Sequence, residues 1–335
     1  MTFSTGEELQ PAGAKGSAET NGAAGPHGIP VRFAAADGYW LGGFLWQAAE
    51  AQPDRPVVLI ASATSVRCRY YQRFATYLFD NGFDVLTFDY RGIDQSRPQQ
   101  MRGLEADWVD WGEKDVEAAL GFLALRFPGR SVDVVAHSIG GCVIGLAPSN
   151  HRLRRIATVG SQYAHWRDYA PEQRWRMLWK WHVVMPLLTA IFGYFPAKRL
   201  GWMEDTPQGV ARNWSRMKAR FEDTVCRPDR RGGRRDPDIL RKRFRNVTAS
   251  ILAISLSDDP HGTIPAVRRL LAYFETADRQ HLHLAPGDIS HAAVGHFAFF
   301  HDRFRDALWP LALTFLRDGA VPDQFRHALL STDIP

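Results

Sequence analysis

The stretch VDVVAHSIGG, residues 132–141, decides the fold of this 335-residue chain. Its apolar run predicts a buried strand over 131–136, and the apolar residues after Ser138 predict a helix over 139–146. Ala136 and Gly140 flank the serine two positions away on either side. Residues this small permit a sharp strand-to-helix turn that exposes a serine hydroxyl in a cleft, so we predict that Ser138 is a nucleophile.

The composition is that of a globular protein with a substantial core. Hydrophobic residues make up 45% of the chain, which suits one large α/β domain that carries an insertion. The excess of positive charge, +5 in total, lies in arginine clusters at 227–235 and 241–245. These clusters have the pattern of solvated loop and helix faces, and no recognition motif accompanies them, so we expect no nucleic-acid partner.

The sequence indicates neither a metal site nor a cofactor. Cys68, Cys142 and Cys226 lack the spacing of metal ligands, and the chain has no phosphate-binding or dinucleotide-binding motif. Three cysteines without a disulfide framework fit a reducing compartment. Residues 1–28 lack the apolar core of a signal peptide, so we expect a flexible tail there and a cytoplasmic protein.

One apolar segment bears on membrane contact. Residues 183–195 are interrupted by Pro186 and Gly193 and fall short of the roughly 20 residues that span a bilayer. The basic and aromatic segment before it, 174–181, would suit a surface that lies on anionic lipid. A packed lid helix is the commoner explanation, so we expect no transmembrane segment and at most a peripheral membrane contact. The sequence does not indicate an oligomeric state.

Strand and helix signals alternate along most of the chain. Asp37-Gly38 predicts a tight turn between two antiparallel strands. The order of elements predicts a mostly parallel, twisted sheet with helices on both faces. The predicted strands lie at 31–36, 39–47, 57–61, 84–88, 131–136, 156–159, 250–255 and 281–285, and the predicted helices near 70–81, 105–126, 139–146, 264–275 and 303–317.

The alternation stops after the sixth strand. Residues 161–246 have a helical or irregular pattern that includes six tryptophans, which predicts a helical cap inserted at this point. The chain then divides into an N-terminal tail (1–28), a core in two parts (29–160 and 247–320), the cap (161–246) and a C-terminal tail (321–335).

Two loops at the predicted carboxyl edge of the sheet, 256–260 and 287–296, can supply the acid and the base that act with Ser138. A serine hydroxyl needs such a base near neutral pH, and imidazole has a suitable pKa. We favour His296, because Gly295 allows the backbone to approach closely, and we keep His291 as the alternative. His137 is a weaker candidate, because a side chain next to the nucleophile points the other way at such a turn.

A carboxylate must orient the histidine, and two backbone amides must stabilise the oxyanion. Asp259 is the favoured acid, and its neighbour Asp258 stays open as the alternative. The first oxyanion donor is predicted to be the N–H of Ile139, directly after the nucleophile. The second is predicted to come from Thr64 or Ser65, in the loop after the strand at 57–61.

Together these motifs resemble those of α/β hydrolases, in particular a bacterial branch similar to serine aminopeptidases and lysophospholipase-like proteins. The resemblance covers most of residues 30–318 and implies the α/β hydrolase fold. Ala136 stands where the turn usually has glycine, and Ser65 stands where we expect glycine in the oxyanion loop. The matching segments are ATSV (63–66), YY (70–71), DYRGI (89–93), DW (110–111), HSIGG (137–141), GYFP (193–196), DD (258–259) and GHF (295–297).

The predicted chemistry is transfer of an acyl group to Ser138 and then to water. An aromatic cap favours an apolar substrate, so we expect a small or medium hydrophobic carboxylic ester. Amide or peptide hydrolysis, or transfer to another acyl acceptor, would use the same triad. Paired carboxylates in the cap would favour an aminopeptidase, and Glu204-Asp205 is the nearby pair. A ligand-binding protein that keeps the fold without turnover is the other alternative.

Overall fold

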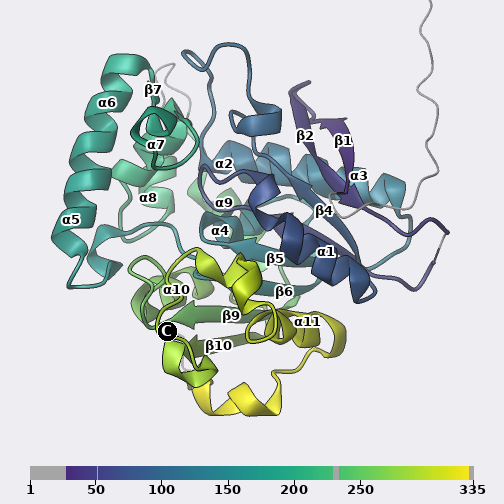
Figure 1. Ribbon diagram of the computed structural model, residues 1–335. Coiled ribbons are helices and arrows are strands. Elements are labelled where there is room, and N and C mark those ends of the chain that lie inside the picture. Colours follow the sequence, from purple (N-terminus) through teal and green to yellow (C-terminus); the bar gives the residue numbers. More distant parts are fainter. Residues whose placement is uncertain (1–27, 51, 229–233, 332–335) are drawn as a thin grey trace, which may run out of the picture.

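The computed structural model describes residues 28–50, 52–228 and 234–331, so the tail expected over 1–28 lies almost wholly outside the described residues. One sheet with the strand order β1-β2-β4-β3-β5-β6-β9-β10 runs through the molecule (Figure 1). β2 pairs antiparallel with β1 and with β4, and all other neighbours are parallel. The strands are β1 Ile29–Ala34, β2 Trp40–Trp46, β3 Val57–Ala61, β4 Asp84–Phe88, β5 Val132–His137, β6 Leu153–Val159, β9 Ser250–Leu256 and β10 Arg279–Leu284.

The central strands are apolar because helices cover both of their faces. All five residues of β3 are buried, and β5 is buried except at Val132. Asp133 is the charged residue within β5, and Arg154 on β6 binds its carboxylate through two nitrogens at 2.9 and 2.5 Å. This pairing allows a carboxylate to lie inside the sheet.

Two apolar clusters hold the helices against the sheet. α1 and α11 contribute Phe74 and Trp309 to the cluster on one face. α3, α4 and α10 contribute to the cluster on the other face, where Leu123, Val143 and Leu270 lie. The helices that flank the sheet are α1 Gln72–Asp80, α2 Trp108–Asp110, α3 Glu117–Arg126, α4 Ile139–Leu146, α10 Ile264–Leu271 and α11 Trp309–Asp318.

Several element boundaries differ from the expected ones. The helix expected from 105 begins at Trp108, because the Asp107 carboxylate accepts hydrogen bonds from the N–H groups of Val109 and Asp110 and so caps the first turn. A π-helical turn, Trp111–Val116, joins α2 to α3. The closing helix expected from 303 begins at Trp309, with Pro310 in its first turn, where proline is tolerated because no intrahelical N–H is needed.

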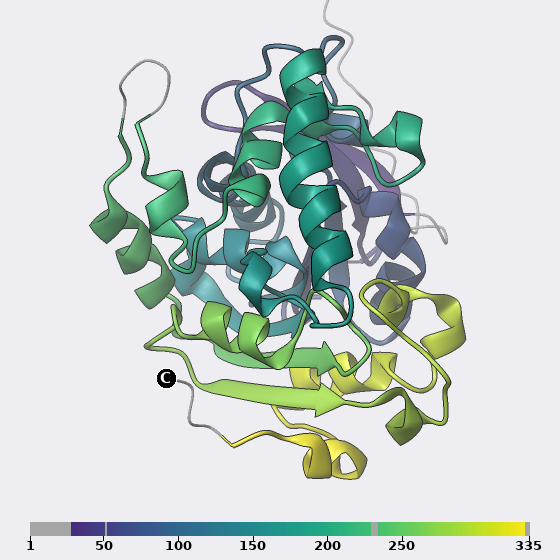
Figure 2. The same cartoon turned by 90° about the vertical axis from the view of Figure 1, so that its left-hand side faces the viewer.

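The segment between β6 and β9 is mainly helical. α5, α6 and α7 lie together on one side of the molecule, at the left in Figure 1 and toward the viewer in Figure 2. α9 packs instead on α4, since its Phe244 ring lies against Gly145, so the contacts with the core resume before residue 246. The elements are α5 Arg174–Leu178, α6 Met185–Phe192, β7 Tyr194–Phe195, β8 Thr206–Pro207, α7 Gln208–Ser215, α8 Glu222–Val225 and α9 Pro237–Arg245.

The described part of the expected C-terminal tail, 321–331, packs against the sheet. Phe325 and Ala328 are buried in the same cluster as α11. Leu329 forms a β-bridge with Leu282 of β10, and the N–H of Leu330 donates to the carbonyl of His281. These contacts make the segment part of the core.

None of the helices within the described ranges is long and apolar enough to cross a membrane.

The close packing of the π-turn Trp111–Val116 against α4 gives a test of the fold. A Cβ on Gly112 would lie 2.5 Å from the Leu146 Cβ and 2.6 Å from the Val143 carbonyl oxygen. Gly112→Ala should therefore lower the free energy of unfolding by about 1–3 kcal/mol, measured by urea denaturation. Gly121→Ala is the matched control, because a Cβ on this residue of α3 would have no heavy atom within 4 Å. It should raise stability by about 0.5–1 kcal/mol, and equal effects of the two changes would contradict this account.

Candidate functional site

Ser138 lies in a tight turn between β5 and α4. Its backbone has φ 55° and ψ −121°, a region that residues with a side chain rarely adopt. α4 approaches β3 so closely that a Cβ on Gly140 would lie 2.4 Å from the Ala61 carbonyl oxygen. Ala136, where glycine is more usual, pairs with Ala61 within the sheet and is fully buried without widening the turn. The small residues thus allow the turn that the sequence predicts.

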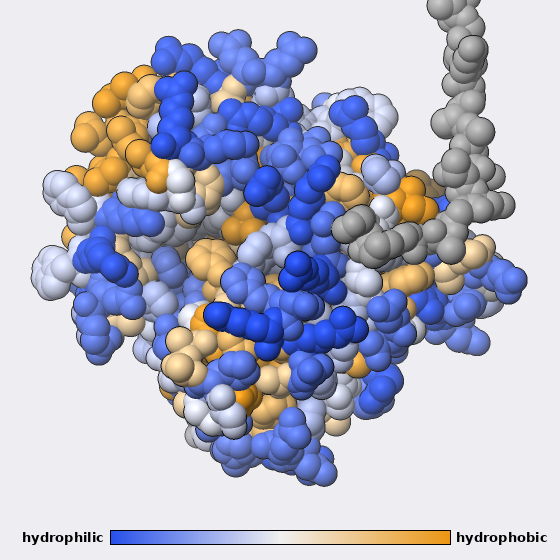
Figure 3. Space-filling view, viewed as in Figure 1, coloured by the Kyte–Doolittle hydropathy of each residue, from blue (hydrophilic) through white to orange (hydrophobic). Residues whose placement is uncertain are grey.

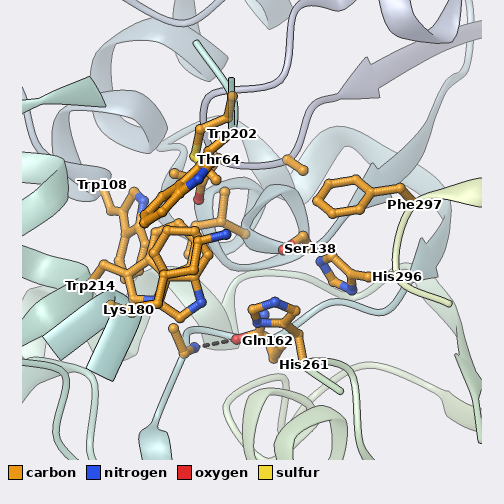
Figure 4. Close-up of a pocket in the computed structure, with 15 residues that line it drawn as sticks. Thr64, Trp108, Ser138, Gln162, Lys180, Trp202, Trp214, His261, His296 and Phe297 are labelled. Carbon is orange, nitrogen blue, oxygen red and sulfur yellow. Dashed lines mark hydrogen bonds between the residues drawn. The ribbon is translucent and has the colours of Figure 1, made fainter. Parts of the chain in front are cut away.

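His296 and Asp259 lie together beside this turn. The Nδ1 atom of His296 is 2.7 Å from Oδ2 of Asp259, and both side chains are almost completely buried. Figure 4 shows the hydroxyl of Ser138 next to the ring of His296. The structure therefore brings together the three residues that we favoured for nucleophile, base and acid.

The carboxylate of Asp259 is held in its ionised form. Burial by itself would raise its pKa, but the charge and hydrogen bond of His296, with further contributions from His261 and the Gly262 amide, lower the pKa to about 2. Oδ1 accepts a second hydrogen bond from the N–H of His261 at 2.8 Å. Room for this packing comes from Gly160, where a Cβ would lie 2.7 Å from Oδ2.

His137 connects the loops around the site. Its Nε2 lies 2.8 Å from the carbonyl oxygen of His296, which can only accept, so Nε2 carries the hydrogen. Its Nδ1 then accepts from the hydroxyl of Tyr71 at 2.8 Å, and that hydroxyl accepts from the N–H of Ala63 at 3.0 Å. Complete burial, and then the nearby charge of His296, lower the pKa of His137 to about 3, so the ring is neutral. This chain of bonds joins the loop after β3 to the backbone of His296.

The two alternative residues lie in other surroundings. Asp258 accepts hydrogen bonds from the N–H groups of Val294 and Gly295 through Oδ2, at 2.7 and 2.9 Å, and so holds the loop that leads to His296. The ring of His291 packs on Phe304, with 4.6 Å between ring centroids.

The two candidates for the second oxyanion donor differ in position. Thr64 lines the same pocket as Ser138 and Ile139. Ser65 is buried with φ 56°, and its hydroxyl is 2.7 Å from that of Thr206. A positive φ is strained for a residue other than glycine, which agrees with our expectation of glycine at this position, and the contact with Thr206 helps to hold the conformation. Ile139 is the first residue of α4, where the N–H has no intrahelical acceptor.

The pocket at Ser138 is aromatic and carries one lysine. It has an empty volume of about 630 Å³. The Nζ atom of Lys180 lies over the rings of Trp181 and Trp202, at 4.4 and 4.0 Å from their centroids. Burial lowers the pKa of this lysine, and Arg176 lowers it further. Among the described residues that line the pocket there is no carboxylate; the lining includes Trp108, Gln162, Lys180, Trp181, Trp202, Trp214, His261 and Phe297 (Figure 4).

A comparison of the sequence with protein families identifies residues 52–231 as similar to the family described as "Serine aminopeptidase, S33". This match covers more than half of the chain. The chain therefore belongs to the serine aminopeptidase family of α/β hydrolases. No curated protein matches its sequence.

Solved structures with the same fold include proteins of several kinds. A soluble variant of monoglyceride lipase from Saccharomyces cerevisiae superposes with a TM-score of 0.60 at 14% identity, over 88% of this chain and 96% of that one. A hypothetical protein from Pseudomonas aeruginosa gives 0.56 at 16% identity, over 93% and 100%. An esterase from Pyrococcus furiosus gives 0.53 at 12% identity, over 86% and 89%. Identities this low show the fold alone.

Sequence reasoning missed the positions of three residues at the site of this serine aminopeptidase family member, namely Tyr71, His261 and Lys180. The hydrogen bonds of His137 reach Tyr71 and His296, which are 66 and 159 positions away, so no local pattern indicates them. His261 follows the acid by two positions, and its ring centroid is 4.8 Å from that of His296. Lys180 belongs to a segment that we interpreted as a packed helix. Within the described ranges, no group of three or more histidine, cysteine or acidic side chains could hold a metal ion.

The burial of His137 gives a prediction about pH. The unfolded chain takes up a proton at this residue near pH 6.5, whereas the folded chain does so only near pH 3, so stability is lost as the pH falls below 6.5. Between pH 6.5 and 5 the wild type should lose about 2 kcal/mol of unfolding free energy through this residue, and His137→Gln should not show this loss. Urea denaturation of both proteins at the two pH values measures the difference. Parallel losses in the two proteins would contradict the assignment of a neutral, buried ring.

Proposed function

We propose that this protein is a serine hydrolase that cleaves a small or medium hydrophobic carboxylic ester through an acyl-enzyme. The observation that carries the proposal is the bond between His296 Nδ1 and Asp259, beside a serine held in a positive-φ turn. An ionised Asp259 accepts the Nδ1–H of His296 and so keeps the lone pair on Nε2. That lone pair is what a base for Ser138 requires.

In the proposed mechanism, His296 Nε2 takes the proton of the Ser138 hydroxyl as its oxygen attacks the ester carbonyl carbon. The N–H groups of Ile139 and Thr64 stabilise the oxyanion of the tetrahedral intermediate. The imidazolium then gives its proton to the leaving alkoxide, and an acyl-enzyme is left. A water molecule, deprotonated by the same histidine, attacks this ester and releases the acid and Ser138.

The lining of the pocket supports a hydrophobic acyl or alkyl group. Four tryptophans and Phe297 surround the space next to Ser138. Aromatic walls of this kind favour apolar groups, because their burial removes hydrocarbon surface from water.

The charges around the pocket favour an ester over a peptide with a free amino terminus. An aminopeptidase needs an anionic group for the substrate ammonium, and Glu204-Asp205 is the nearby pair of carboxylates in the sequence. In the structure Glu204 lies near Arg67 and Lys198, Asp205 binds Arg97, and neither lines the pocket. Lys180 lies there instead and would repel a cationic amine.

The proposal is tested with p-nitrophenyl esters of acetate, butyrate and octanoate. The wild type should hydrolyse at least one of them and should be labelled at Ser138 by a fluorophosphonate probe. Ser138→Ala should lose both the labelling and about 10⁴-fold or more in kcat, since a triad without its nucleophile keeps little activity. Alanine p-nitroanilide serves as the comparison substrate and should be cleaved poorly. If the wild type neither hydrolyses an ester nor reacts with the probe, the proposal is wrong.

The two neighbouring aspartates provide a matched pair of variants. Asp259→Asn should lower kcat by about 10⁴-fold, because an amide stabilises the wrong tautomer of His296. Asp258→Asn should cost far less, because an amide oxygen can still accept the N–H groups of Val294 and Gly295. Steady-state kinetics on the best ester measures both changes. A larger loss for Asp258→Asn would move the role of the acid to Asp258.

A further inference from the structure

One long helix of the segment between β6 and β9 exposes a stripe of large apolar side chains. α5, a π-helical turn at Trp179–Val184, and α6 form continuous helix from Arg174 to Phe192. Every fourth residue on its outer side is exposed: Trp175 (77%), Trp179 (62%), Val183 (38%), Leu187 (59%) and Ile191 (59%). Figure 3 shows apolar side chains gathered over α6.

The geometry of the helix keeps these five side chains on one side. In an α-helix, side chains four residues apart are displaced slightly from one another around the axis, because a turn takes 3.6 residues. The π-turn in the middle has more residues per turn and offsets that displacement. The opposite side of the same helix is buried, with Met177, Trp181 and Met185 in the core. The outer stripe is therefore a distinct face and not a scatter of single exposed residues.

The charge around this face is positive. From Gln173 to Met203 the sequence has no Asp or Glu, although Glu172 directly precedes this stretch. Of its five basic residues, Lys180 lies in the pocket and Lys198 pairs with Glu204, so Arg174, Arg176 and Arg199 carry the charge. Arg102 adds a further cation at the end of the helix, where it donates to the carbonyl oxygens of Phe192 and Ile191. Glu204 and Asp205, the acids that follow the segment, are engaged by Arg67, Lys198 and Arg97.

From these observations we propose that the outer face of helix 174–192 docks on the surface of an anionic lipid bilayer. Apolar side chains flanked by Arg and Lys are the pattern of helices that lie in the membrane interface, with tryptophan at the level of the headgroups. A second copy of the chain fits less well, because it would bring two basic faces together. The inner side of the helix stays packed in the core, so the helix would lie along the bilayer surface and not across it.

Docking in this orientation would bring the pocket close to the lipid. Lys180 and Trp181 belong to the same helix and line the pocket at Ser138. Trp202, which is 37% exposed, lies edge-on to Trp181 at 5.9 Å and also lines the pocket. Membrane binding does not require turnover, so it can be tested separately from the proposed hydrolysis.

The test is co-sedimentation of the full-length protein with phosphatidylcholine vesicles, with and without phosphatidylglycerol. The wild type should sediment with the anionic vesicles, much less with the neutral ones, and less at high salt, because salt screens the attraction between the arginines and the lipid. The double variant Trp179→Ser/Leu187→Ser should bind at least about tenfold more weakly, since it removes two of the apolar anchors.

Trp40→Ser is the matched control, because Trp40 is an equally exposed tryptophan (56%) at the start of β2. This variant should bind vesicles like the wild type, and thermal melts should show that both variants are folded. Failure of the wild type to bind anionic vesicles would overturn the proposal, as would an equal loss in Trp40→Ser. A wild-type dimer that the double variant converts to a monomer, without vesicle binding, would also overturn it and make this face an interface between two copies. Ester hydrolysis measured on soluble substrates distinguishes these outcomes from a failure of the proposed function.

Discussion

The close approach of α4 to β3 is the constraint on which the site depends. Gly140 lies against the carbonyl oxygen of Ala61 with no room for a side chain, so the helix starts directly behind the last residue of β5. That start forces Ser138 into a backbone conformation that costs roughly 1–3 kcal/mol, which the surrounding sheet and helix must offset. The same approach places the N–H of Ile139 at the carboxyl end of β5. The neighbouring strands lead into the loops that carry the other residues of the site.

The second feature of the site is a set of hydrogen bonds that joins loops far apart in the sequence. His137 turns away from the cleft and, with Tyr71, connects Ala63 to the backbone of His296. Asp258 holds the other side of the same loop through two backbone amides. Two side chains adjacent to candidate catalytic residues thus position the loop of His296. Ser138 and Asp259, which directly follow His137 and Asp258 in the sequence, face the ring of His296 itself.

The sequence predicted the strands and a mostly parallel sheet well, because buried parallel strands and the turns between them are encoded locally. It also predicted that Ser138, Asp259 and His296 would meet, since all three follow strands whose carboxyl ends share one edge. It could not decide between Asp258 and Asp259, because both lie in the same loop and only the path of the backbone separates them. The bonds of His137 and the position of Lys180 depend on tertiary packing between distant segments. The start of α11 was misplaced because the helical pattern extends back through residues that fold as a 3₁₀ turn.

The π-turn at Trp179–Val184 allows helix 174–192 to hold one extra residue without changing its faces. A π-helical turn contains about one residue more than the α-helical turns that cover the same rotation. Removal of one residue from this turn would therefore restore α-helical geometry and leave Leu187 and Ile191 on the outer side, opposite the buried Met185 and Thr189. Removal of one residue from within α6 would instead rotate everything after it by about 100°. The effect of a deletion in this helix thus depends on whether it falls inside or outside the π-turn.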